Sequence, residues 1–378
     1  MKPTSELRKR TDGEQRILHR EEFISNTVKY LLIDLIRVAG LIVSEFRSQA
    51  GLSLRHSIRA WRRGFTRFNY CMYGLAQSGN PEDYLSDFEA LRQEHINSRF
   101  VEIVKNKLSF PLLMKQCGIP SPEIHGVIRN GIFYSLHPME TAEPAGFLKE
   151  LRKPGDRIVL KPLSGWHGFG YLMLEQSNNG YRVNGEDATL RDVTGMTGEL
   201  NNYIVTEFIN QGEYAAGLYP HTTNTIRMLT FLDPETTTPF IARVVQRIGT
   251  SRSLPVDNFR GGSGGLSATV DPDSGNLGPA AMVDAKGHVT WHTRHPETDA
   301  RIEGVVVPAW SEIRSSILEC ANRLAFAPLI AWDIAPTRTG FSVIEGNPSS
   351  GMPVMQIHGP MLTDPRIRRF YKYHNVIK

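Results

Sequence analysis

The sequence reads Leu329-Ile-Ala-Trp-Asp-Ile-Ala335, then Pro336-Thr-Arg-Thr-Gly340, then Phe341-Ser-Val-Ile-Glu-Gly-Asn-Pro348. Two apolar runs on either side of a break that contains Pro and Gly predict a β-hairpin. Successive side chains of a strand point to opposite faces of its sheet. Glu345 is therefore expected to share a face with the residue two positions later, whereas Ile344 is expected to point into the core.

The predicted hairpin brings oxygen-bearing side chains together. If Ala335 pairs with Phe341, Asp333 lies on the same face as Glu345, diagonal to it and within side-chain reach. Together with Asn347, this places two carboxylates and one amide oxygen at the rim of an apolar sheet. Such ligands suit a hard cation such as Mg²⁺. The alternative is that both acids only occupy an exposed hairpin face, as most acidic residues do.

The composition is that of an ordinary globular protein. The chain has 378 residues, 40% hydrophobic and 22% charged, which is enough for two or three subdomains, and a net charge of +4 does not by itself indicate nucleic-acid binding. Three widely spaced cysteines predict free thiols in a reducing compartment. The first residues lack a signal-peptide pattern, and charged residues interrupt the most apolar run, 28–46. We therefore predict a cytoplasmic protein without a membrane-spanning helix.

A basic, aromatic-rich segment precedes most of the predicted strands. Residues 52–75 carry five arginines with aromatic residues between them, and no acidic residue occurs from Phe46 to Pro81. Three functions are open for this segment. Residues 47–75 could lie on an anionic membrane surface, or bind RNA or another polyanion through arginines and stacked aromatics. The segment could instead pack its aromatic side chains on the main domain and keep its arginines in water.

A glycine-rich loop follows the strand that carries Lys161. The sequence from Arg157 to Leu174 predicts a strand, a loop with three glycines, and a returning strand. Glycines let backbone N–H groups approach a phosphate closely, and the lysine adds a positive charge. The loop does not open a helix, so it is neither a P-loop nor a Rossmann turn. We predict a flap over nucleotide phosphates, with a plain flexible hairpin as the alternative.

A series of short motifs occurs in order between residues 80 and 360. They are Asn106-Lys107 before Cys117-Gly-Ile-Pro-Ser-Pro122, Val159-Leu-Lys-Pro-Leu-Ser-Gly165, Ile204-Val-Thr-Glu-Phe-Ile209, Asn224-Thr-Ile-Arg227, Val256-Asp-Asn-Phe259, Trp332-Asp-Ile334 and Ile344-Glu-Gly-Asn347. The series resembles the ATP-grasp superfamily and, within it, the sugar-transfer-associated ATP-grasp group. The resemblance implies an α+β fold of two lobes with a nucleotide between them. We expect a helical N-terminal segment (1–100), an N-terminal lobe (101–206) and a C-terminal lobe with the metal site (207–378).

The resemblance also implies roles for individual residues. The ATP phosphates would meet Lys107, Lys161, Ser164, Gly165, Gly168 and Gly170, and the adenosine part would meet Glu207, Phe208, Ile209 and Glu213. Mg²⁺, or Mn²⁺, would be held by Asp333, Glu345 and Asn347. Arg227 would face the γ-phosphate and the acyl intermediate, with Arg247 and Asn258 as further candidates.

The function that the resemblance implies is an ATP- and Mg²⁺-dependent carboxylate–amine ligase. Such an enzyme forms an amide or peptide bond through an acyl phosphate and releases ADP and phosphate. Its substrates would be small-molecule or peptide carboxylates and amines. Two alternatives are an ATP-grasp phosphotransferase and a non-catalytic nucleotide-binding module docked through its basic N-terminal helices.

Overall fold

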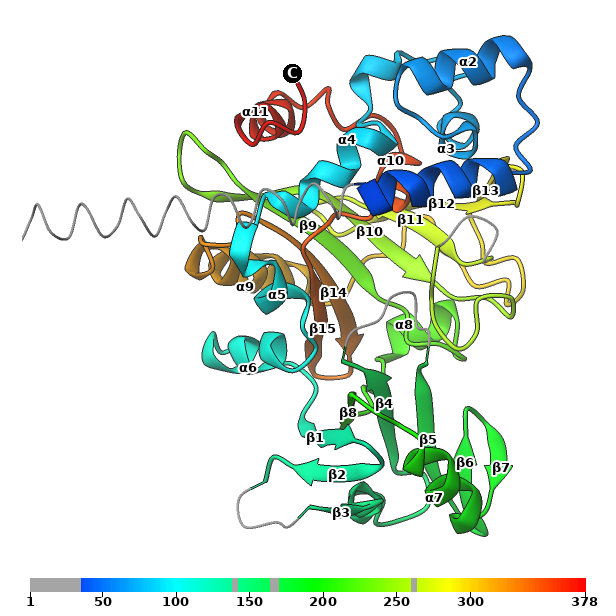
Figure 1. Ribbon diagram of the computed structural model, residues 1–378, viewed down its shortest axis with the longest axis vertical. Coiled ribbons are helices and arrows are strands. Elements are labelled where there is room, and N and C mark those ends of the chain that lie inside the picture. Colours follow the sequence, from blue (N-terminus) through cyan, green and yellow to red (C-terminus); the bar gives the residue numbers. More distant parts are fainter. Residues whose placement is uncertain (1–34, 138–141, 164–169, 260–263) are drawn as a thin grey trace, which may run out of the picture.

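Two antiparallel β-sheets, one above the other in Figure 1, organise the chain. The computed structural model describes residues 35–137, 142–163, 170–259 and 264–378. In the described residues the first sheet has the strand order β3-β2-β1-β8-β4-β5-β6-β7, and the second has the order β13-β12-β11-β10-β9-β14-β15. The predicted mixed α+β fold with two lobes is confirmed.

The strands of the two sheets occupy separate parts of the sequence. The first sheet contains β1 (Ile124–Arg129), β2 (Ile132–Ser135), β3 (Glu143–Pro144), β4 (Arg157–Pro162), β5 (Leu172–Ser177), β6 (Gly180–Val183), β7 (Glu186–Ala188) and β8 (Tyr203–Glu207). The second contains β9 (Ile226–Leu232), β10 (Pro239–Ile248), β11 (Leu266–Val270), β12 (Leu277–Val283), β13 (Val289–His292), β14 (Leu329–Thr337) and β15 (Gly340–Asn347).

Helices surround both sheets. They comprise residues 35–47 and α2 (Leu54–Arg62), α3 (Arg67–Met72), α4 (Asp87–Leu91), α5 (Val101–Lys105), α6 (Ser109–Gln116), α7 (Leu190–Gly198), α8 (Glu213–Leu218), α9 (Trp310–Arg323), α10 (Met352–Gln356) and α11 (Pro365–Tyr373). Short 3₁₀ turns are η1 (Pro81–Asp83), η2 (Arg92–His95), η3 (Ser98–Phe100) and η4 (Gly146–Glu150). Within the described ranges, no helix has both the length and the apolar character that crossing a bilayer requires.

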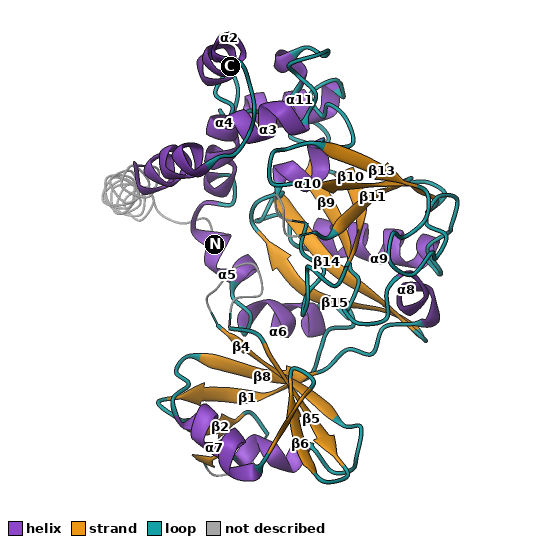
Figure 2. Ribbon diagram, turned by 90° about the vertical axis from the view of Figure 1, so that its right-hand side faces the viewer, coloured by secondary structure: helices purple, strands orange, loops and turns teal. Residues whose placement is uncertain are grey.

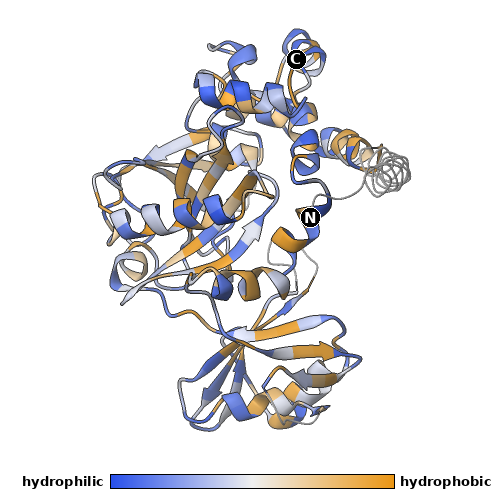
Figure 3. Ribbon diagram, turned by 90° about the vertical axis from the view of Figure 1, so that its left-hand side faces the viewer, coloured by the Kyte–Doolittle hydropathy of each residue, from blue (hydrophilic) through white to orange (hydrophobic). Residues whose placement is uncertain are grey.

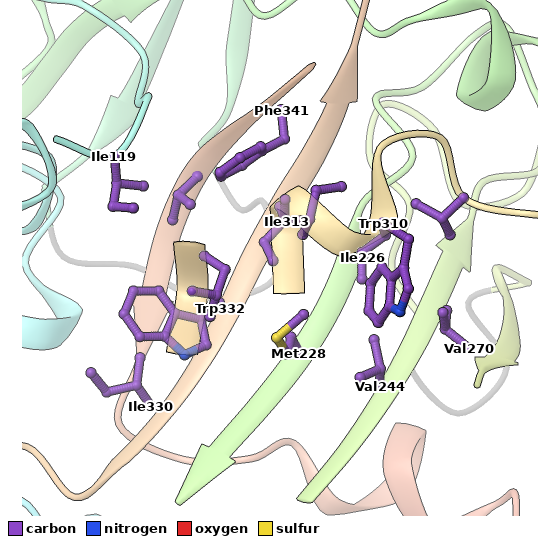
Figure 4. Close-up of a cluster of buried hydrophobic side chains, with 14 of the residues drawn as sticks. Ile119, Ile226, Met228, Val244, Val270, Trp310, Ile313, Ile330, Trp332 and Phe341 are labelled. Atoms are coloured by element: carbon purple, nitrogen blue, oxygen red, sulfur yellow. The ribbon is translucent and has the colours of Figure 1, made fainter. Parts of the chain in front are cut away.

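The second sheet carries the largest core because helices cover both of its faces (Figure 2). On one face, Met228 and Trp332 lie in one cluster with Trp310 and Ile313 of α9 (Figure 4). Phe110 and Met114 of α6 belong to the same cluster. On the other face, Leu229 and Phe231 pack with α10 and α11, where the ring of Phe231 stacks on Phe370 at 4.0 Å between centroids. The first sheet has a separate core, which it forms with η4 and α7. Many of the apolar residues lie in the strands of the two sheets (Figure 3).

The basic, aromatic-rich segment packs on the second sheet. Phe65, Tyr70 and Tyr73 are buried and form one cluster with Ala281 and Val283 of β12. Several arginines of the segment remain at the surface, for example on α2. These aromatic side chains therefore follow the third sequence interpretation, in which they pack on the main domain.

The register of the last hairpin differs from the predicted one. Ala335 pairs with Ser342 rather than Phe341, and Asp333 stands directly opposite Glu345 rather than diagonal to it. The ladder shifts by one residue between Asp333 and Ile334, so Ile344 is the extra residue of a β-bulge. The bulge leaves Ile344 only half-buried, and Val343 enters the core in its place.

A glycine in this hairpin makes room for a helix. Gly346 pairs with Trp332, and a Cβ added to Gly346 would lie 2.4 Å from the ring of Phe110 in α6. Phe110 in turn packs against Trp332, with 5.9 Å between ring centroids. Since all three positions belong to one close-packed layer, α6 can approach β15 only where the strand lacks a side chain.

We expect Gly346→Ala to destabilise the protein by about 1–3 kcal/mol, because the new methyl group overpacks a core that cannot expand freely. Gly195→Ala is the matched control, since Gly195 lies inside α7 with open space around its Cα. Alanine there should be neutral or stabilising by up to about 1 kcal/mol. Urea denaturation measures both effects, and equal stability of the two variants would contradict the packing argument.

Candidate functional site

A row of charged side chains crosses the strands of the second sheet. Arg227 of β9 pairs in register with Asp333 of β14, and Asp333 pairs with Glu345 of β15. Arg247 approaches the same carboxylate from β10. Residues directly opposite in antiparallel strands have adjacent side chains, so the sheet itself places these groups together.

Asp333 is bound by both arginines. Arg227 donates from Nε to Oδ1 and from Nη2 to Oδ2, each at 2.6 Å, and Arg247 donates from Nη2 to Oδ2 at 3.0 Å. Asp333 is only 2% exposed. The two parallel bonds from Arg227 form the bidentate arrangement that fixes both planar groups.

A second buried carboxylate holds Arg247 in place. Asp257 accepts hydrogen bonds from the backbone N–H and the hydroxyl of Thr225, at 2.8 and 2.6 Å, and lies 3.3 Å from Nη2 of Arg247. Arg247 also donates to the Thr225 hydroxyl from Nη2 at 2.6 Å. Two arginines and two aspartates therefore balance one another in this network, which is the condition for burying charges without a large penalty.

The arginines control the ionisation of Asp333. Burial by itself would raise the pKa of this carboxyl group, but the adjacent charges of Arg227 and Arg247 and the hydrogen bonds from Arg227 hold the pKa well below its usual range. Conversely, Asp333 raises the pKa of Arg227 against the effect of burial. The carboxylate is therefore ionised throughout the physiological pH range.

Lys161 links the first sheet to this row. Burial lowers the pKa of Lys161. The negative charges of Glu345 and Asp333 act against this shift, and the positive charge of Lys107 adds to it. Lys161 lies at the end of β4, whereas Glu345 and Asp333 belong to the second sheet. A lysine of one lobe thus lies within electrostatic range of two carboxylates of the other lobe.

The donor set fits a hard divalent cation. An ionised carboxylate offers about four lone-pair positions, and the arginines occupy three of those on Asp333. One position therefore remains for a metal ion. Glu345 and Asn347 share a face, as predicted, with the Asn347 amide nitrogen 3.4 Å from Oε1 of Glu345. Rotation of that amide presents its oxygen beside the carboxylate, so the three side chains supply oxygen ligands of the kind that Mg²⁺ takes.

The other candidate residues are spread over both lobes. Lys107 stands between α5 and α6, Gly170 precedes β5, Glu207 ends β8, Phe208 and Ile209 follow it, Glu213 begins α8, and Asn258 lies in the segment after β10. Ser164, Gly165 and Gly168 lie outside the described residues. The roles that the resemblance implies for all of these residues stay predictions.

Four of these residues have surroundings that the structure describes. Gly170 has φ of +74°, and a Cβ there would lie 2.7 Å from the hydroxyl of Tyr203. The Arg157 guanidinium covers the ring of Phe208 at 4.0 Å, and Glu207 accepts a hydrogen bond from the Glu123 backbone at 3.3 Å. Glu213, by contrast, is exposed, and Oε1 of its carboxylate lies 3.8 Å from Nη2 of Arg338, which is also exposed.

Sequence reasoning gave no role to three residues that shape the site. Thr225 and Asp257 position Arg247. Asn224 is fully buried, and its amide donates hydrogen bonds to the backbone carbonyls of Ala215 and Tyr219, at 2.8 and 2.6 Å. All three occur inside the motifs quoted above. Their burial was the missing information, because a polar residue next to a strand is more often exposed.

A family model matches most of the chain. Residues 89–370 match the model of a family described as sugar-transfer associated ATP-grasp. The chain belongs to this family. Its two antiparallel sheets are therefore the two lobes of an ATP-grasp fold, as the motif series predicted. No curated protein matches the chain.

Several solved structures resemble the chain. An ADP complex of PurK, an N5-carboxyaminoimidazole ribonucleotide synthetase, is 11% identical, with a TM-score of 0.37 over 65% of this chain and 45% of that chain. The ATP-grasp ligase PsnB, complexed with minimal precursor, Mg and ADP, is 13% identical, with a TM-score of 0.34 over 73% and 62%. D-alanine–D-alanine ligase from Bacillus anthracis, complexed with ATP, is 13% identical, with a TM-score of 0.35 over 72% and 68%. The chain thus spans less than half of the PurK chain.

We expect Asp333→Asn to lower the free energy of unfolding by about 3 kcal/mol at pH 7, because Arg227 loses its carboxylate partner and Asp257 alone is left beside Arg247. The folded-state pKa of Asp333 lies below its unfolded value of about 3.9. The stabilisation is therefore complete above about pH 5 and is lost as the pH falls through the folded-state pKa. Denaturation curves between pH 3 and 8 should show a constant difference above pH 5 that shrinks below pH 4.

Asp299→Asn is the control for this measurement. Asp299 also pairs with an arginine, at 2.7 Å, but its side chain is 82% exposed. Exposed pairs contribute about 0–1 kcal/mol, so this variant should change stability little. If both variants lost the same free energy of unfolding, burial between two arginines would not increase the contribution of Asp333 to stability.

Proposed function

We propose that this ATP-grasp protein is an ATP- and Mg²⁺-dependent carboxylate–amine ligase. It would activate a small-molecule or peptide carboxylate as an acyl phosphate and transfer the acyl group to an amine, with release of ADP and phosphate. The main support is that Lys161 of one lobe lies within electrostatic range of Glu345 and Asp333 of the other. A metal–triphosphate complex needs carboxylates that hold its metal ion and cationic side chains that bind its phosphates.

Charge is the chief obstacle to the reaction, because an anionic carboxylate must approach the anionic γ-phosphate. Lys161 and Lys107 would bind the phosphates and reduce this repulsion, as cationic groups do in phosphoryl transfer. Arg227 uses Nε and Nη2 for Asp333, so its Nη1 edge, which faces Gly351, can meet the γ-phosphate. Because Asp333 holds one edge of the guanidinium, the group already has a fixed orientation before a phosphate binds.

Asp333, Glu345 and Asn347 would hold Mg²⁺, or Mn²⁺. When bound, this ion would neutralise phosphate charge. Arg227 and Arg247 keep Asp333 ionised, and β14 and β15 keep the three ligands on one face. The chain's residues therefore bind and orient substrates, and the sequence of steps requires no nucleophile from the protein.

We expect Glu345→Gln to reduce turnover by about 100-fold or more, since it removes a charged ligand while it keeps the side-chain volume. The assay measures ATP-dependent hydroxamate formation with hydroxylamine, which traps acyl phosphates, over a panel of amino acids, dipeptides and uronic acids. Glu345 is preferred to Asp333 for this test because it does not pair with two buried arginines. Glu312→Gln, at an exposed position in the first turn of α9, should leave turnover unchanged.

The same assay separates the ligase from a phosphotransferase. A ligase yields ADP, phosphate and hydroxamate, whereas a phosphotransferase yields ADP and a stable phosphoester without hydroxamate. ADP formation that is insensitive to Glu345→Gln would overturn the proposed metal site. Binding of ATP without any turnover on the whole panel would instead favour the nucleotide-binding module.

We also propose that α2 contacts an anionic membrane surface. Leu54, Ile58 and Trp61 of this helix are exposed to 72%, 45% and 48%, next to exposed Arg55 and Arg59. Apolar and basic side chains together on a surface helix are the combination that binds anionic lipid headgroups. The buried aromatic residues of α3 do not take part, so the contact is confined to the outer helix.

We expect the protein to co-sediment with vesicles that contain phosphatidylserine, and to do so less as the salt concentration rises. The double variant Ile58→Ser, Trp61→Ser should lose most of this binding because it removes apolar side chains from the contact. Leu190→Ser, at an exposed apolar position of α7, serves as the control. Equal binding of all three proteins, or equal binding to neutral vesicles, would rule out this contact.

A further inference from the structure

A second cluster of metal-ligating groups lies in the first lobe. His125 of β1, His137 after the end of β2, and Glu150 at the end of η4 each offer one ligand atom, and these atoms lie within 4.8 Å of one another. This cluster lies in the first lobe, whereas the residues proposed for Mg²⁺ are on the second sheet. It has no part in the function proposed above.

The spacing of the cluster is close to that of a bound ion. Ligand atoms at about 2.1 Å from one tetrahedral metal ion lie about 3.4 Å apart. Nδ1 of His125 and Oε2 of Glu150 are 3.6 Å apart, which is too long for a hydrogen bond but near that value. The imidazole rings of His125 and His137 have centroids 6.2 Å apart, so small side-chain rotations bring all three ligand atoms into range.

His125 carries a buried nitrogen that needs a partner. The residue is 8% exposed, and its Nδ1 has no hydrogen-bond partner within the described part of the chain. Leaving a buried polar atom without a partner costs about 1–3 kcal/mol, so such atoms are uncommon in folded proteins. A bound ion at this position would remove that cost.

The backbone turns His125 toward the cluster. Ile124 pairs with Thr206 and Gly126 with Val205, so His125 is the extra residue of a β-bulge in β1. Bulges redirect a side chain away from the regular alternation. The His125 carbonyl accepts a hydrogen bond of 3.0 Å from Leu136, which holds the chain beside His137.

We propose that His125, His137 and Glu150 form a binding site for Zn²⁺ or a chemically similar divalent transition-metal ion. Two imidazoles and one carboxylate are a donor set that zinc accepts with a fourth position left for water. Imidazole nitrogen does not suit Mg²⁺, so the two sites select different ions.

The ion would fasten three parts of the first lobe to one another. β1, the end of β2 and η4 are joined around it, close to Glu123, whose backbone carbonyl accepts a hydrogen bond from Glu207 at 2.9 Å. Because Glu207 is the last residue of the central strand β8, the metal would stiffen that end of the sheet, next to the connection between the lobes. We expect this role to be structural.

The test titrates Zn²⁺ into metal-free full-length protein in the presence of excess Mg²⁺, followed by calorimetry. We expect one equivalent of Zn²⁺ to bind to the unmodified protein. His137→Ala and Glu150→Gln should each weaken that binding by about 100-fold, because each removes one of three ligands. His288→Ala is the matched control, since His288 also lies 3.1 Å from a carboxylate, that of Asp284, but outside this cluster.

Circular dichroism of each metal-free variant shows whether it is folded. Absence of Zn²⁺ binding by the unmodified protein would overturn the proposal, and so would binding that persists in both folded variants. Glu345→Gln should bind Zn²⁺ normally, whatever its effect on turnover. Failure of the ligase proposal is therefore distinguishable from failure of this one.

Discussion

The second lobe depends on one buried carboxylate, Asp333, that is shared by two arginines from neighbouring strands. Three hydrogen bonds of 2.6–3.0 Å connect β14 to β9 and β10 through this side chain. A shift of β14 by one residue would point Asp333 toward Met228 in the core, where a charge has no partner, and would turn Trp332 out of that core. The ion network therefore fixes the strand register as well as the electrostatics of the candidate site.

The general fold was predictable because its signals are local. Two apolar runs around a break with Pro and Gly identified the strands of the last hairpin, and the alternation of side chains along a strand placed Glu345 and Asn347 on one face. The exact pairing was not predictable, because a bulge at Ile344 depends on packing that no local pattern records. Val343 fills a core already lined by Trp332 and Ile334, and this packing outweighs the regular ladder.

The candidate site was only partly predictable for a related reason. Its carboxylates and cations could be proposed from the motif series, but their pairing could not. Arg227 and Asp333 are 106 residues apart in the sequence, and Arg247 meets Asp333 over 86 residues. The cluster of His125, His137 and Glu150 was missed because a bulge and a short 3₁₀ turn, rather than a regular spacing, bring its members together.

The position of Lys107 has a consequence for how the two lobes can move. Helices α5 and α6, on either side of it, pack on β15 of the second lobe, although they precede the first lobe in the chain. A hinge motion that separates the lobes would carry Lys161 away from Glu345 but leave Lys107 where it is. Lys107 would thus stay beside the arginines of the second sheet in an open form, and Lys161 would join them only on closure.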